Sequence, residues 1–135
     1  MTRVVADTNI LVSSLFWSGN PNRIIQKGIN RKLKIYTSRP IIDELKRILK
    51  RDFHVSDQEI GDIIESLNAF TVPAKPRERI SYIKEDPDDN IILECAVAAG
   101  ADYIISGDHH LINIGKFRNI RIVTAAEFLT IIMDK

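Results

Sequence analysis

The stretch DPDDNIILECAVAAGADYIISGD, residues 86–108, predicts a helix followed by a buried strand. Asp86 is suited to cap a helix that begins at Pro87, and Gly100 is suited to end it, with no helix breaker between them. The apolar run Tyr103-Ile104-Ile105 then predicts a short strand. A helix that leads directly into a buried strand is typical of an α/β sheet.

Two carboxylates of this stretch fall where a charge is costly to bury. On a period of 3.6 residues, Asp89 shares a helix face with apolar residues such as Leu93, whereas Asp86 and Asp88 are expected at the surface and the cap. Asp108 follows the strand, at the edge where open α/β sheets bind their ligands. We therefore expect Asp89 and Asp108 to converge on one crevice.

The rest of the chain alternates strands with helices. Strands are expected at residues 3–6, 33–37, 70–73 and 120–123, helices at residues 22–30, 39–49, 57–67 and 125–132, and an irregular surface crossing at residues 74–84. Capping boxes at Ser56 and Thr124 mark two of the helix starts. This alternation predicts an α/β fold, a three-layer α/β/α sandwich with a mostly parallel central sheet.

Length and composition are those of an ordinary globular domain. The 135 residues, 44% hydrophobic and 27% charged, predict a single domain over residues 1–135 that needs no disulfide or structural metal. The lone Cys95 cannot form an intrachain disulfide and favours a reducing, cytoplasmic location. We expect no membrane association, because no signal-peptide core or membrane-spanning run is present.

Asp7 stands at the carboxyl end of the first predicted strand, just before a helix. A carboxylate in that position loses its solvation unless a cation or hydrogen-bond donor satisfies it. A helix N-cap explains Asp7 equally well, so this residue alone leaves a structural and a functional role open.

The helix that begins near Arg39 carries a further acid and a basic run. Glu44 lies on the border of its apolar stripe, although a rim salt bridge is the commoner role of a single helix glutamate. The stretch from residue 31 to residue 51 contains eight basic residues and only two acidic ones. Such a run is usually a solvated surface and becomes informative only beside an acidic metal site, because a polyphosphate substrate would need cations for its backbone. The candidates for binding such a backbone are Arg39, Lys46, Arg47 and Lys50.

Asp7, Glu44, Asp89 and Asp108 are thus expected near the carboxyl edge of one sheet. Clustered carboxylates raise each other's pKa and cost on the order of several kcal/mol when unpaired. Mg²⁺ or Mn²⁺ suits an all-carboxylate site, whereas zinc would favour histidine and cysteine ligands, which are not suitably spaced here. Two such ions could generate hydroxide from water and stabilise the charge of an opening phosphodiester.

His109 and His110 follow Asp108 directly. A histidine pair beside a strand end is usually a surface feature. A minor role in substrate binding stays open because Asp108 is adjacent.

Five motifs, in this order, resemble the PIN-domain family: DTN at residues 7–9, SRPIIDEL at 38–45, DPDDN at 86–90, ADYIISGD at 101–108 and IVTAAEFL at 122–129. The resemblance spans nearly the whole chain. Its one departure is Ala125, where family members have a proline at a helix start. It implies a PIN-like fold and a Mg²⁺- or Mn²⁺-dependent ribonuclease, often the toxin of a toxin–antitoxin pair.

Carried over by position, Asp7, Glu44 and Asp89 correspond to the core metal ligands of the family and Asp108 to its fourth acid. The predicted supporting residues are Asn9, which matches the polar residue beside the first aspartate, and Ser106. The expected partners are an RNA substrate, an antitoxin protein and a second copy of the chain, to which the apolar pair Phe16-Trp17 could contribute unless it is simply core.

Other functions receive less support. A haloacid-dehalogenase-type phosphatase needs a second aspartate two residues after the first, where this chain has Asn9. Dinucleotide and P-loop motifs are absent from the sequence. The open alternatives are a noncatalytic PIN-like RNA-binding or assembly module, disfavoured because unused clustered charge is destabilising, and a housekeeping RNA-processing nuclease.

Overall fold

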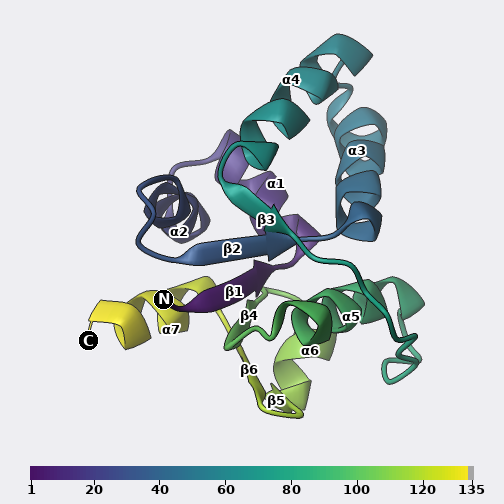
Figure 1. Ribbon diagram of the computed structural model, residues 1–135. Helices are drawn as coiled ribbons and strands as arrows, with labels where there is room; N and C mark the ends of the chain where they lie inside the picture. Colours follow the sequence, from purple (N-terminus) through teal and green to yellow (C-terminus); the bar gives the residue numbers. More distant parts are fainter. Residues whose placement is uncertain (134–135) are drawn as a thin grey trace.

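The computed structural model describes residues 1–133 as helices packed around a six-stranded sheet of order β3-β2-β1-β4-β6-β5 (Figure 1). Every neighbouring pair is parallel except β5 and β6, which are antiparallel. The predicted three-layer α/β/α class with a mostly parallel sheet is therefore confirmed. The strands are β1 (Arg3–Ala6), β2 (Lys34–Thr37), β3 (Thr71–Pro73), β4 (Tyr103–Ile105), β5 (Lys116–Phe117) and β6 (Ile120–Val123).

Three of the helices, α3, α4 and α7, begin at the residues predicted. They are α1 (Thr8–Phe16), α2 (Asn20–Ile29), α3 (Arg39–Phe53), α4 (Asp57–Asn68), the 3₁₀ turn η1 (Pro87–Asp89), α5 (Asn90–Ala99), α6 (His109–Ile114) and α7 (Ala125–Met133). The Thr124 capping box forms reciprocally with Glu127. In the described residues, 1–133, no helix combines the length and apolar character needed to cross a bilayer.

The structure differs from the sequence prediction in four elements. β5 and α6 were not predicted, because two and six residues are too few to show a period. The helix expected from Pro87 to Ala99 begins as a 3₁₀ turn, and α5 starts only at Asn90. The helix predicted over residues 22–30 begins earlier, at Asn20, and its apolar residue Ile29 is exposed.

The core lies between the sheet and the helices on its two faces. α5 packs on β1, β2 and β4, whereas α1 packs on α2 and α2 on α7 (Figure 1). Fully buried side chains come from both helical layers and the sheet, among them Leu11, Leu93, Ile104 and Phe128. Removing these side chains from water is the main favourable term for the fold.

Strand register brings two chain segments to the same level at the carboxyl edge of the sheet. Ala6, the last residue of β1, pairs with Ile105, the last residue of β4. The next residue, Asp7, donates its backbone N–H to the Ile105 carbonyl at 3.0 Å. Asp7 and Ser106 consequently leave adjacent strands side by side.

The surface crossing before η1 is attached to α5 more firmly than its sequence suggested. Its residues Ile80 and Ile83 are buried. The Asn90 side chain donates to the Ile83 carbonyl at 2.8 Å and accepts from the Ile83 N–H at 2.9 Å. Glu94 accepts from the Ile80 N–H at 2.9 Å. These bonds fix the segment that leads to Asp89.

Replacing Asn90 with alanine should therefore lower the free energy of unfolding by about 2–4 kcal/mol, since a buried peptide donor and acceptor both lose their partner. Urea denaturation followed by circular dichroism measures this loss. Asn113→Ala is the matched control, because Asn113 lies exposed on α6. Equal stability of the two variants would contradict a structural role of the Asn90 side chain.

Candidate functional site

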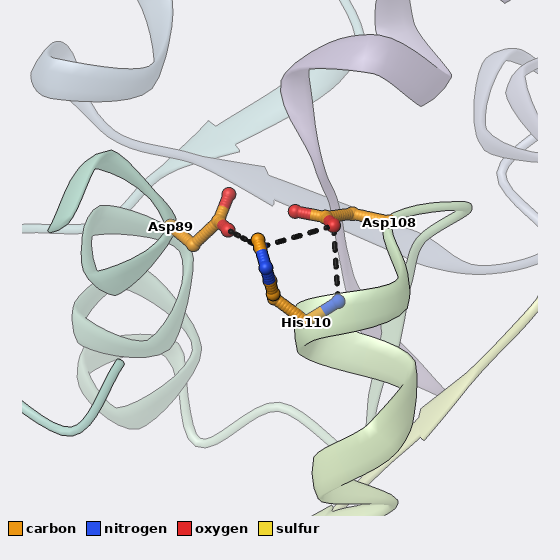
Figure 2. Close-up of side chains that lie close together, drawn as sticks. All are labelled: Asp89, Asp108 and His110. Carbon is orange, nitrogen blue, oxygen red and sulfur yellow. Dashed lines mark hydrogen bonds and ion pairs between the residues drawn. The ribbon is translucent and has the colours of Figure 1, made fainter. Parts of the chain in front are cut away.

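Asp89, Asp108 and His110 gather where η1 meets α5 and where α6 begins (Figure 2). One potential ligand atom from each residue lies within 4.8 Å of the other two. The His110 Nδ1 is 3.6 Å from Asp89 Oδ2 and 3.6 Å from Asp108 Oδ1. Three side chains from two distant chain segments thus face one point.

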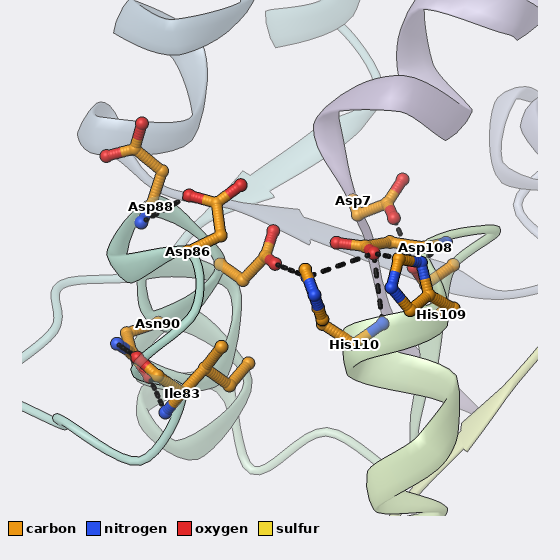
Figure 3. Close-up of polar contacts among 10 residues, drawn as sticks. Asp7, Ile83, Asp86, Asp88, Asn90, Asp108, His109 and His110 are labelled. Atoms are coloured by element: carbon orange, nitrogen blue, oxygen red, sulfur yellow. Dashed lines mark hydrogen bonds and ion pairs between the residues drawn. The ribbon is translucent and has the colours of Figure 1, made fainter.

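Asp7 lies next to this group (Figure 3). Its side chain is held by a hydrogen bond from Ser106. The Ser106 hydroxyl donates to Asp7 Oδ2 and accepts from the Asp108 N–H at 2.9 Å. The other oxygen, Asp7 Oδ1, accepts from the Ile10 N–H at 2.8 Å and caps α1. Asp7 is only 4% exposed. The sequence position of Asp7 left open a role as a helix cap and a role in a site. The two roles are therefore compatible.

Burial raises the pKa of Asp7, and the nearby charge of Asp108 raises it further. Hydrogen bonds from Ser106, Ile10 and Gly107 oppose this effect by stabilising the carboxylate. Ser106 therefore acts both on the position and on the charge of Asp7.

The protonation of Asp89 and the protonation of Asp108 depend on each other. Burial, followed by the interaction with Asp108, raises the pKa of Asp89 to about 8. Burial also raises the pKa of Asp108, but Asp89, the His110 backbone N–H and the two histidine side chains outweigh it, so the pKa of Asp108 falls below its usual value. Without a bound cation, the pair tends to retain one proton near neutral pH.

Glu44 lies on α3, near enough to other acids for their charges to act on it, and is not part of the three-residue group. Burial raises the pKa of Glu44, and the charges of Asp88, Asp86 and Asp7 add to this rise, whereas Arg47 lowers it. The Asp7 charge also raises the pKa of Asp89. Asp7 therefore interacts electrostatically with Glu44, with Asp89 and with Asp108, whereas Asp89 and Asp108 are in the closest association.

The three acids of the DPDDN motif have different surroundings. Asp86 accepts from the Asp88 N–H at 3.2 Å and caps η1, and Asp88 is exposed. Asp89 alone belongs to the group with Asp108 and His110. The helix-face reasoning that favoured Asp89 is consistent with this placement.

The remaining candidates lie farther from the centre. Asn9 is exposed on α1 and, within residues 1–133, makes no hydrogen bond to Asp7, so Ser106 alone provides a side-chain contact to that acid. The four basic candidates, Arg39, Lys46, Arg47 and Lys50, are exposed. Lys50 pairs with Asp57 at 3.1 Å, whereas Arg47 acts on Glu44.

The donor set fits a divalent cation. Asp89 Oδ2 is buried and, among the described residues, has no hydrogen-bond partner. An unpartnered carboxylate oxygen is costly to bury, and a shared cation would satisfy it together with the oxygen of Asp108. Asp7 and Glu44 could complete the negative field around such an ion.

His110 is the site residue that the sequence pattern did not single out. Its side chain is 30% exposed, whereas that of the adjacent His109 is 76% exposed. The sequence could not separate the two, because α6 is too short for a helical period to assign their faces. The contact of Asn90 could not be predicted from the sequence either, because its partner Ile83 lies in an irregular segment.

The chain is similar to known proteins in sequence and in fold. A family model described as a PIN domain matches residues 3–110, a range that contains all four predicted acids. The structure of VapBC2 from Rickettsia felis bound to a DNA fragment from their promoter contains a chain of similar fold, with a TM-score of 0.65 and 12% identity over 90% of this chain and 97% of that one. At that identity the likeness concerns the fold alone. A search of curated protein sequences returns no match.

The raised pKa of Asp89 predicts how stability depends on pH. Between about pH 4 and pH 8 the folded metal-free protein holds a proton that the unfolded chain has released, so its free energy of unfolding falls as the pH rises through this window. Asp89→Asn should reduce this fall, because asparagine has no such proton. Unfolding from pH 4 to pH 9 in EDTA measures the effect.

The matched control is Asp88→Asn, which removes one exposed charge from the same motif. Parallel pH profiles for the wild type and Asp89→Asn would show that the Asp89 carboxyl is not held protonated in the fold.

Proposed function

This chain belongs to the PIN-domain family, and we propose that residues 1–135 form a single nuclease domain that hydrolyses RNA phosphodiester bonds with Mg²⁺ or Mn²⁺. PIN domains are generally nucleases. The observation that carries the proposal is the meeting of Asp89 and Asp108 beside Asp7, with the buried Asp89 Oδ2 left without a partner. Carboxylates arranged in this way destabilise the fold without a cation, and they can bind a cation when one is present.

In this proposal Asp7, Glu44, Asp89 and Asp108 hold the metal at the carboxyl edge of the sheet. A bound divalent ion would lower the pKa of a water molecule and would stabilise negative charge on the scissile phosphate. Ser106 orients Asp7 through its hydroxyl and favours the charged form of that carboxyl against the effect of burial. Asn90 contributes indirectly, because it anchors the segment from which Asp89 projects.

We further propose that the domain is the toxin of a toxin–antitoxin pair and works in the cytoplasm. The fold likeness to a chain of the VapBC2 complex supports this role. A homodimer is part of the same proposal. Its support is the exposed aromatic pair Phe16 and Trp17, which packs on the half-buried Phe53, with the ring centroids of Phe16 and Phe53 4.5 Å apart.

Each of Asp7→Asn, Glu44→Gln, Asp89→Asn and Asp108→Asn should lower RNA cleavage by at least about a hundredfold, because each removes charge from the proposed metal site. EDTA should abolish cleavage by the wild type, and added Mn²⁺ should restore it. The assay uses end-labelled RNA panels with purified full-length protein.

The metal-free variants should remain folded and be as stable as the wild type or more so, because carboxylate repulsion is relieved. Asp43→Asn is the control, since it removes an acid from α3 outside the proposed ligand set. Full activity of Asp89→Asn would refute its role. Folded wild type that binds RNA but cleaves none with either ion would favour a noncatalytic module.

The surroundings of the basic candidates predict that Arg47 contributes to RNA binding more than Lys50. Arg47 acts on Glu44 and has no ion pair among residues 1–133, whereas Lys50 is paired with Asp57. Arg47→Gln should weaken RNA binding and reduce the slope of log affinity against log salt by about 0.7, the contribution of one single-strand phosphate contact.

Lys50→Gln is the matched control and should change the slope less. Fluorescence anisotropy of labelled RNA between low and moderate salt gives both slopes. Equal slopes for the wild type and both variants would mean that this face of α3 does not touch RNA.

A further inference from the structure

We propose that the His110 imidazole is a nitrogen ligand of the metal in this site and that it makes the site prefer Mn²⁺ over Mg²⁺. The inference rests on the proposed metal-dependent function and adds to it a ligand outside the four acids. It concerns the identity of the ion, which the carboxylates alone leave open between these two.

The position of the ring nitrogen is the first reason. His110 Nδ1 lies 3.6 Å from an oxygen of Asp89 and 3.6 Å from an oxygen of Asp108, beyond hydrogen-bond distance of either. Two atoms that bind one cation at about 2.1 Å lie at most about 4.2 Å apart. The spacing therefore matches ligands that share an ion better than groups bonded to each other.

The second reason is the atom that the imidazole faces. Asp89 Oδ2, one of the two oxygens 3.6 Å from Nδ1, is the buried oxygen that lacks a hydrogen-bond partner in the part of the chain described. Figure 2 shows the imidazole between the two carboxylates. A cation at this point would satisfy the lone pairs of Oδ2 and Nδ1 together.

The third reason is that His110 is held in place. Its backbone N–H donates to Asp108 Oδ1 at 3.0 Å, so the residue is tied to one of the proposed ligands. The next residue, Leu111, is fully buried and anchors the first turn of α6. A ligand attached to a fixed backbone loses little freedom on binding an ion.

Ligand chemistry then gives the selectivity. Mg²⁺ prefers oxygen ligands and keeps several of its waters, whereas imidazole nitrogen favours first-row transition ions. Mn²⁺ lies at the weak end of that series and suits carboxylates, but as a transition ion it accepts an imidazole nitrogen more readily than Mg²⁺ does. One imidazole among carboxylates therefore strengthens Mn²⁺ binding while contributing little to Mg²⁺ binding.

A purely electrostatic role for His110 predicts a different result. If the imidazole only offsets the charge of the two carboxylates, replacing it would alter the affinity for both ions by a similar factor. The ratio of the two affinities therefore distinguishes a ligand from a charge partner.

The test uses the full chain as wild type, His110→Gln and His109→Gln. His109 is the matched control, because its Nδ1 lies 3.8 Å from the same Asp108 oxygen while its side chain is largely exposed. Electron spin-echo envelope modulation of the Mn²⁺-loaded proteins detects nitrogen bound to the ion. Competition titrations give the affinities for Mn²⁺ and Mg²⁺, and thermal unfolding in EDTA verifies the fold of each variant.

We expect nitrogen modulation in the wild type and His109→Gln and its loss in His110→Gln. The Mn²⁺ affinity of His110→Gln should fall on the order of tenfold or more, with a Mg²⁺ change below about threefold. Because the wild-type spectrum is informative by itself, ¹⁵N-histidine labelling of the wild type tests the same assignment even if His110→Gln does not fold.

Mn²⁺ binding without nitrogen modulation in the wild type, or an equal loss of both affinities in His110→Gln, would overturn the assignment of His110 and leave the proposed nuclease intact. Absence of any Mn²⁺ or Mg²⁺ binding by the folded wild type would overturn both. Modulation that persists in folded His110→Gln would assign the nitrogen to another residue and also refute the inference.

Discussion

The candidate site depends on the backbone hydrogen bond from Asp7 N–H to the Ile105 carbonyl, which continues the β1–β4 pairing one residue beyond the strands. It places Asp7 beside Ser106, and Ser106 in turn receives the Asp108 N–H. A shift of one residue in this register would turn Asp7 to the other face of the sheet and separate it from Ser106. Register in the apolar core therefore fixes the relative positions of two acids that are distant in sequence.

The cost of burying carboxylates connects the fold to the proposed chemistry. Desolvation is the largest cause of the raised pKa values of Asp7, Glu44 and Asp89. A protein optimised only for stability would replace such groups with neutral ones. Hydrogen bonds nevertheless position Asp7, and the segment before Asp89 is anchored. These features are consistent with a site that a divalent cation completes.

Much of the fold followed from local patterns. The alternation of apolar strands with 3.6-residue periods predicted the α/β class, and the caps at Ser56 and Thr124 predicted two helix starts. The inward face of the helix after Pro87 distinguished Asp89 from Asp86, and the structure places it with Asp108. The roles of the four acids as metal ligands stay a prediction, as does the supporting role of Asn9, which the structure leaves exposed.

The sequence by itself determined most of the element types, the fold class and the small set of acids that could form a site, because periodicity, capping and strand ends are local properties of the chain. Only the tertiary structure decided which groups meet. The bond of Ser106 to Asp7, the clamp of Asn90 on Ile83 and the approach of His110 rather than His109 to Asp89 depend on side-chain direction and on packing between distant segments. Those contacts are set by the sheet register and the buried core, which no short stretch of sequence encodes on its own.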